Sequence, residues 1–153
     1  MNRRKPAAVF DTGIILQATI SRTGPATKLL RQFDEGAITL FVSEELLAEM
    51  RDVLFRPSIR TKNVRYSDEG LENLLQRLEK NGVMVTRLPE HFQYERDADD
   101  EHVINLAIEA GAEFLVSRDK DLLDLASDAE FTARFPNLTI LDPVAFLNRI
   151  YAE

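Results

Sequence analysis

Apolar residues along this chain follow two different periods, and the two alternate from one end to the other. Short runs rich in β-branched and aromatic residues, bounded by turn-forming residues, predict strands. Longer stretches with apolar residues three and four positions apart predict amphipathic helices. The expected strands span 7–10, 38–42, 83–88, 114–116 and 139–141. The expected helices span 14–20, 25–35, 44–55, 68–81, 100–110, 122–126 and 143–150.

Residues at the ends of these segments support the boundaries. Pro25 stands at a first helical position, where a missing N–H is tolerated, and Ser43 is a suitable N-cap. Gly82 and Gly111 follow the last periodic residues of two helices and are expected to end them. Helices that alternate with strands predict an α/β fold with a mainly parallel central sheet. Because no linker or repeat divides the chain, we expect one domain over residues 1–153.

Composition narrows the chemistry that such a domain can perform. The chain has no cysteine, which excludes disulfides and thiolate metal sites, and only two histidines. A metal ion would therefore be held by oxygen ligands, which favour Mg²⁺ or Mn²⁺ over zinc. No apolar run approaches the roughly 20 residues that a membrane span needs. The basic N-terminus is followed only by a short strand and not by a secretory signal, which leads us to expect a cytoplasmic protein.

The net charge of −7 is an argument against nucleic-acid binding, because nucleic-acid-binding proteins are usually basic. The objection weakens if several of the acids are metal ligands, since bound cations reverse the local charge.

Two aspartates lie just beyond predicted strands. Asp11 follows the first strand directly, and Asp119 comes three residues after the strand 114–116. In parallel α/β sheets, ligands bind outside the carboxyl ends of the strands, so both side chains are expected at the binding edge. Each has a simpler interpretation as well: Asp11 as an acceptor in a turn, and Asp119 as the N-cap of the next helix, worth typically about 1 kcal/mol.

Two further acids lie on predicted helices. Asp100 shares one helical face with Ile104 and Ala107, and a carboxylate on a buried face is costly unless it is paired or metal-bound. It could instead cap the helix, with Asp97 and Asp99 as rival caps. Glu49 borders the apolar stripe of its helix, a place where a plain amphipathic helix often carries a glutamate.

The four acids say more together than singly. If Asp11, Glu49, Asp100 and Asp119 meet at about 5 Å, each pair repels by roughly 3 kcal/mol at an effective dielectric constant near 20. That repulsion exceeds what any helix cap contributes, so such a cluster implies a divalent cation. The inference holds only if the fold brings the four side chains together.

At these residues the chain resembles the PIN-domain family, especially the PIN ribonucleases that are toxins of bacterial toxin–antitoxin pairs. The resemblance covers nearly the whole chain. Four segments carry it, in family order: VFDT at 9–12, SEELLAE at 43–49, DADDEHVI at 97–104 and LVSRDKDL at 115–122. The stretch from 97 to 122 is the most specific part.

The resemblance implies a three-layer fold with helices on both faces of the sheet, and RNA cleavage with Mg²⁺ or Mn²⁺. It assigns catalysis and metal binding to Asp11, Glu49, Asp100 and Asp119. It also implies supporting roles for four neighbours: Thr12, Ser117, Asp97 and Asp121. The chain departs from the family at Gly13, where Asn is common, which puts substrate positioning in question rather than metal binding.

The expected partners are an RNA substrate, an antitoxin protein and a second copy of the chain. For RNA the candidate contacts are a run of four bases, with a solvated loop as the alternative: Arg56, Arg60, Lys62 and Arg65. Arg118 and Lys120 flank an acid and either touch phosphate or balance local charge. His102 is expected at the surface by its helical angle, and the leucines at 71–78 fit either a core or a dimer surface.

Two alternative functions remain at this point. One is a catalytically weak PIN-like module that binds RNA or protein. The other is a phosphatase of the haloacid dehalogenase type, because FDTG at 10–13 loosely resembles the nucleophile loop of that class. That loop needs a second Asp where this chain has Gly13, which argues against the phosphatase.

Overall fold

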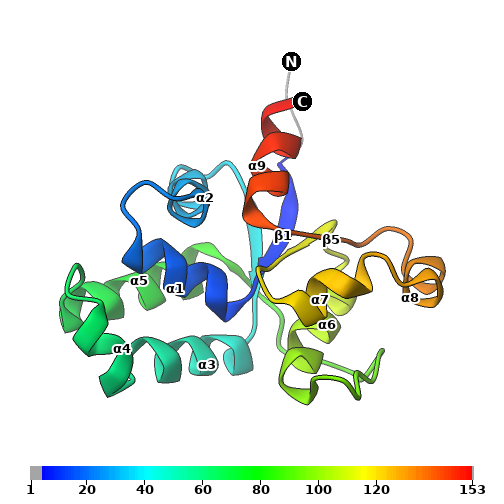
Figure 1. The fold of residues 1–153 in the computed structure, drawn as a ribbon, viewed down its shortest axis with the longest axis horizontal. Helices are drawn as coiled ribbons and strands as arrows, with labels where there is room; N and C mark the ends of the chain where they lie inside the picture. The colour runs from blue at the N-terminus through cyan, green and yellow to red at the C-terminus, as the bar shows by residue number, and fades with distance from the viewer. Residues whose placement is uncertain (1–4, 153) are drawn as a thin grey trace.

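The structure is a computed structural model that describes residues 5–152 (Figure 1). A five-stranded sheet lies at its centre in the order β3-β2-β1-β4-β5, and every neighbouring pair of strands is parallel. The strands are β1 (Ala7–Phe10), β2 (Thr39–Val42), β3 (Val83–Met84), β4 (Phe114–Val116) and β5 (Thr139–Leu141). The predicted parallel sheet is confirmed.

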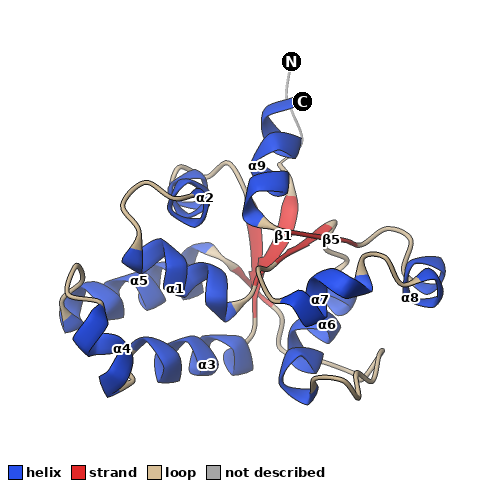
Figure 2. Cartoon of the chain, in the orientation of Figure 1, coloured by secondary structure: helices blue, strands red, loops and turns tan. Residues whose placement is uncertain are grey.

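Helices lie on both sides of this sheet (Figure 2). In the view shown, α1 to α5 lie to the left of the strands and α6 to α8 to the right. The first group is α1 (Thr12–Ile20), α2 (Pro25–Asp34), α3 (Glu44–Leu54), α4 (Pro57–Lys62) and α5 (Asp68–Asn81). The second is α6 (Ala98–Ala110), α7 (Lys120–Leu125) and α8 (Ala129–Arg134), and α9 (Pro143–Ala152) follows β5. The predicted three-layer α/β architecture is confirmed.

The strand order creates a switch point between β1 and β4. From the central β1 the chain adds β2 and β3 on one side, then returns to add β4 and β5 on the other. At such a point the connections that leave neighbouring strands diverge, which opens a crevice at the carboxyl edge. The register pairs Phe10 with Val116, so the two strands end level and the residues that follow them leave the sheet side by side.

The apolar faces of the helices are buried within the chain. The leucines of α5 at 71, 74, 75 and 78 are all buried, as are Leu46, Met50 and Leu54 of α3. The leucines of α5 are therefore core residues. Their periodicity no longer supports self-association, and a dimer remains a prediction from family resemblance alone. Within residues 5–152, none of the helices combines the length and hydropathy required to cross a bilayer.

The strand predicted over 83–88 is shorter in the structure, because β3 contains only Val83 and Met84. It is an edge strand whose sole partner, β2, ends at Val42. The N–H of Val85 still reaches the carbonyl oxygen of Val42 at 2.8 Å, and past this point the neighbour offers no further pairing.

Two short helices, α4 and α8, were not predicted. Each has six residues, which is too few to show a repeating apolar stripe. None of the residues of α4 is buried, and in α8 only Phe131 is buried. The helix α6 also begins two residues earlier than expected, because the side chain of Asp97 caps it by accepting a hydrogen bond from the N–H of Asp99 at 3.0 Å.

Candidate active site

The site begins where β1 and β4 end. The N–H of Asp11 donates to the carbonyl oxygen of Val116 at 3.2 Å, so Asp11 extends the pairing of the two strands by one residue. Ser117 leaves β4 at the same level, and its side chain is completely buried. The Oγ of Ser117 donates a hydrogen bond to the Oδ2 of Asp11 and accepts one from the N–H of Asp119 at 2.9 Å. This hydroxyl therefore joins the two strand-end aspartates.

Asp11 has a structural and an electrostatic role. Its Oδ1 accepts a hydrogen bond from the N–H of Ile14 at 3.1 Å, which caps α1. Asp11 is also buried, with only 8% of the residue exposed. Burial raises the pKa of Asp11 to about 6, against the lowering effect of its hydrogen bonds, and the charges of Asp119 and Glu49 add to the rise. The interpretation of Asp11 as an acceptor of backbone hydrogen bonds is thus correct without excluding a function.

Four carboxylates gather between the start of α6 and the start of α7. Asp97, Asp100, Asp119 and Asp121 can each offer an oxygen such that all four oxygens lie within 4.8 Å of one another. Asp97 and Asp119 are the N-caps of α6 and α7. Asp100 lies in the first turn of α6, so the predicted alternative that Asp100 caps this helix is wrong.

This group contains two of the four acids assigned from resemblance, Asp100 and Asp119, and two of the assigned supporting residues, Asp97 and Asp121. Asp11 and Glu49 lie outside this set of mutually close oxygens. Asp11 still acts on it, because its charge raises the pKa of Asp100.

Asp100 is the most perturbed acid of the group. Burial raises its pKa to about 8, and the charges of Asp119 and Asp97, together with a hydrogen bond to Asp119, contribute to the rise. Its Oδ2 is buried and has no hydrogen-bond partner among the described residues. The ionised form of Asp100 is therefore poorly satisfied by the protein alone.

These features fit a divalent cation. All the available ligands are oxygens, the type that Mg²⁺ and Mn²⁺ prefer. Oxygens on opposite sides of one Mg²⁺ lie about 4 Å apart, which matches the spacing of the group. The unpartnered oxygen of Asp100 is available to a cation. Asp121 is less free, because its carboxylate also pairs with Arg96 at 2.8 Å.

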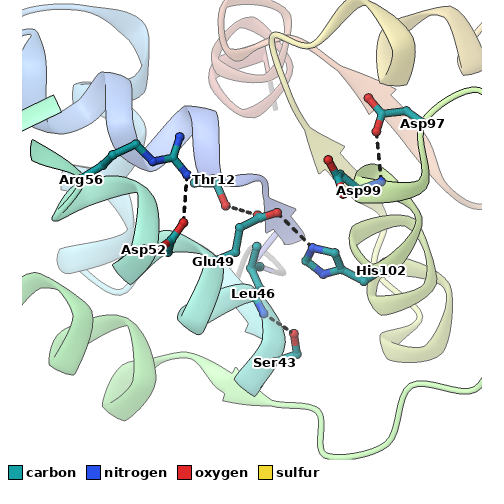
Figure 3. A network of polar contacts seen from close by, with 9 residues as sticks. All are labelled: Thr12, Ser43, Leu46, Glu49, Asp52, Arg56, Asp97, Asp99 and His102. Atoms are coloured by element: carbon teal, nitrogen blue, oxygen red, sulfur yellow. Dashed lines mark hydrogen bonds and ion pairs between the residues drawn. The ribbon is translucent and has the colours of Figure 1, made fainter. Parts of the chain in front are cut away.

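Glu49 of α3 lies between Thr12 and His102 and outside this group (Figure 3). Its Oε2 accepts a hydrogen bond from the Oγ1 of Thr12, and its Oε1 lies 3.3 Å from the Nε2 of His102. The hydrogen bond of His102, with a smaller contribution from Thr12, holds the pKa of Glu49 below its ordinary value. Both hydroxyl residues assigned beside the acids, Thr12 and Ser117, thus bind a carboxylate.

The expectation that His102 is a surface residue is wrong. Only 13% of its side chain is exposed, and it contacts Glu49. The angle count failed because α6 packs on β1, β2, β4 and α3 and is therefore buried on several sides. Leu106, one turn further along the same face, is fully buried and was the available signal in the sequence.

The four bases predicted to bind RNA lie in and around α4, which Figure 1 shows at the end of α3 away from the strands. Three of them already have partners. Arg56 pairs with Asp52 at 2.9 Å, and Arg60 with Asp68 at 2.9 Å. Arg65 donates to the carbonyl oxygens of Ala18 and Ser21 near the end of α1. Among the described residues, the side chain of Lys62 forms no ion pair or hydrogen bond.

Comparison with known proteins agrees with this geometry. A family model described as a PIN domain matches residues 7–121. No curated protein matches the chain. The matched residues make up most of the sequence and include every acid of the site described above. The chain therefore belongs to the PIN domain family.

Proposed function

We propose that this protein is an endoribonuclease that depends on Mg²⁺ or Mn²⁺. The observation that carries the proposal is the oxygen cluster of Asp97, Asp100, Asp119 and Asp121 at the switch point of the sheet, where the buried Oδ2 of Asp100 has no hydrogen-bond partner within residues 5–152. PIN domains are generally nucleases, and such a cluster suits the divalent ions that phosphodiester hydrolysis uses.

The residues would divide the work as follows. Asp100 and Asp119 would hold the cation directly, and Asp97 and Asp121 would supply further oxygen ligands or orient the water bound to the cation. Asp11 and Glu49 would face it from the end of β1 and the middle of α3 and orient water or substrate. Ser117 and Thr12 keep two of these carboxylates in place through hydrogen bonds. A bound cation would activate water and neutralise the charge that develops on the phosphate.

The finer parts of the proposal rest on family resemblance. They are that the enzyme is the toxin of a toxin–antitoxin pair, that an antitoxin protein masks the site, and that two copies associate. We also propose that the enzyme acts on RNA in the cytoplasm.

Cleavage of single-stranded RNA is expected to require a divalent ion. Removing metal with EDTA should abolish cleavage, and adding Mg²⁺ or Mn²⁺ in excess should restore it, because the four carboxylates would repel a phosphate unless a cation neutralised them. Gel analysis of an end-labelled RNA measures both steps. A D119N variant prepared in parallel controls for contaminating nuclease. If the wild type still cleaves RNA after exhaustive chelation and the D119N variant does not, the proposed role of the metal is wrong.

We further propose that the basic side chains nearest the site contact RNA phosphates. Arg118 and Lys120 flank Asp119, are exposed, and have no ion pair or hydrogen bond among the described residues. The R118Q/K120Q variant should bind RNA more weakly and with a salt dependence shallower by about one per lost phosphate contact. Substituting the segment that contains Arg56 and Lys62 should change the slope less per residue, because most of its bases are already paired.

Fluorescence anisotropy of labelled RNA, titrated at several salt concentrations with an inactive D100N background, gives these slopes. Lys80, in the last turn of α5, supplies a control substitution, K80Q. If R118Q/K120Q leaves the salt dependence unchanged and substitutions near Arg56 make it shallower, the RNA binds at α4 instead.

A further inference from the structure

Both oxygens of the Glu49 carboxylate are held, and the two donors come from different helices. Thr12 at the start of α1 donates to Oε2, and the Nε2 of His102 on α6 approaches Oε1 at 3.3 Å. Figure 3 shows the carboxylate between these two side chains. Two donors on opposite oxygens fix the plane of a carboxylate as well as its position.

His102 makes this contact from a shielded position. Its side chain is 13% exposed, whereas that of Glu49 is 34% exposed. The Nδ1 of His102 is buried and has no hydrogen-bond partner among the described residues. Glu49 is therefore the polar partner that compensates the burial of this imidazole, and a side chain as exposed as Glu49 could otherwise turn toward solvent.

We propose that His102 is a positioning residue that holds the Glu49 carboxylate toward Asp11 and thereby sets the affinity of the site for its divalent cation. The proposal rests on the proposed function, in which Glu49 faces the cation. Partners that orient metal-site carboxylates typically change metal affinity or activity by about 10- to 100-fold when they are removed. His102 would act in this way through Glu49 and would not touch the substrate.

The chain offers a matched control. His91 pairs with Glu109 through Nε2 and Oε1 at 2.9 Å, so it makes the same chemical contact in another place. Glu109 lies nine residues beyond Asp100 on α6, about 14 Å along the helix axis. Loss of this second pair should leave the cation site unchanged.

Two amide substitutions separate positioning from mere packing. The side-chain nitrogen of glutamine lies close to where Nε2 of histidine lies, so H102Q can still donate to Glu49. Asparagine is one methylene shorter, so H102N cannot reach the carboxylate. Both amides are neutral and polar, and circular dichroism melts confirm that each variant is folded before binding is compared.

The measurement is Mn²⁺ binding to the full chain by titration calorimetry, which needs no substrate. We expect H102N to weaken Mn²⁺ binding by at least tenfold, H102Q to keep the affinity within about threefold of the wild type, and H91N, which breaks the His91–Glu109 pair, to leave it unchanged. The Mn²⁺ concentration that RNA cleavage needs should rise in the same order. Equal Mn²⁺ affinities in H102N and H102Q, at whatever level, overturn the positioning role.

Two further variants keep this test distinct from that of the proposed function. If E49Q and D100N weaken Mn²⁺ binding and H102N does not, the site is a metal site and His102 does not position Glu49. If neither E49Q nor D100N weakens it, the proposed metal site itself is wrong.

Discussion

Replacing Asp100 with asparagine is expected to abolish RNA cleavage and, at the same time, to stabilise the metal-free protein. Asp100 is crowded by Asp119 and Asp97, and its Oδ2 has no partner within the described structure. Removing its charge relieves repulsion that, for a half-exposed group screened by water and ions, is on the order of 1 kcal/mol. The melting temperature in EDTA should then rise by roughly 2–4 °C.

Mg²⁺ should reverse the order of the two proteins. A ligand that binds only the folded state stabilises it by mass action, so millimolar Mg²⁺ should raise the melting temperature of the wild type and affect D100N much less. Thermal melts with EDTA and with Mg²⁺ measure both differences. Asp128 caps α8 and is not one of the four mutually close carboxylates, and D128N should change neither result because Asn caps a helix about as well as Asp.

A D100N protein that is less stable in EDTA, yet still responds to Mg²⁺ and still cleaves RNA, contradicts the site. Asp100 would then act only within the first turn of α6, and the cluster at the switch point would be structural.

Most of the fold could be predicted because its elements carry local signals. The strand at 7–10 and the strand at 114–116 are continuous apolar runs, as expected for strands buried on both faces, and their bounds agree with the structure. Gly111 was expected to end α6, and it adopts φ 66°, a conformation that other residues rarely take. The elements that were missed, α4 and α8, have no periodic apolar face: α4 begins at Pro57 without a side-chain cap, and α8 is capped by the side chain of Asp128.

The site was harder to predict than the fold, because it depends on which helix packs against which. Asp97 was expected as a supporting residue, and the structure places it among the mutually close carboxylates while Glu49 lies apart from them. His102 was misplaced for the same reason, since its partner comes from α3, 53 residues earlier in the chain. A helical angle describes one helix, whereas contacts of this kind depend on the packing of two.

The second large effect concerns pH. The free energy of unfolding of the metal-free protein is expected to fall as the pH rises from about 4 to about 8, the reverse of ordinary acid denaturation. Burial raises the pKa of Asp11 to about 6 and that of Asp100 to about 8, from ordinary values of 3.8. The folded protein therefore holds protons on these groups that the unfolded chain has already released, and ionising them costs stability.

The neighbouring pair acts in the same direction. The hydrogen bond and the charge of Glu49 outweigh burial and raise the pKa of His102 above 6.5. The stability that this contributes is complete below pH 6.5 and is lost as the pH rises through the folded-state pKa. The pKa of Glu49 is lowered from 4.5, so its own contribution is present above that value and is lost only at lower pH. No shift among these groups opposes the trend between about pH 5 and pH 8.

The size of the effect follows from the best-buried group. For Asp11, a rise in pKa from 3.8 to about 6 corresponds to roughly 3 kcal/mol at most, and Asp100 adds a smaller, solvent-screened amount. More than half of the cost for Asp11 is already incurred below pH 5, so roughly 1.4 kcal/mol of it falls between pH 5 and pH 8. In EDTA and at constant ionic strength, the melting temperature should therefore drop by about 3–6 °C over this range through Asp11 alone, and further through Asp100. Mg²⁺ should raise the melting temperature little at pH 5, where protons occupy the site, and most at pH 8, where the ionised carboxylates are available to it.

The double variant D11N/D100N should lose most of the pH dependence of the melting temperature and most of its response to Mg²⁺. A metal-free melting temperature that stays level or rises over this range, or a Mg²⁺ effect that is as large at pH 5 as at pH 8, would show that these carboxylates are not the charged, unsatisfied groups on which the proposed site depends.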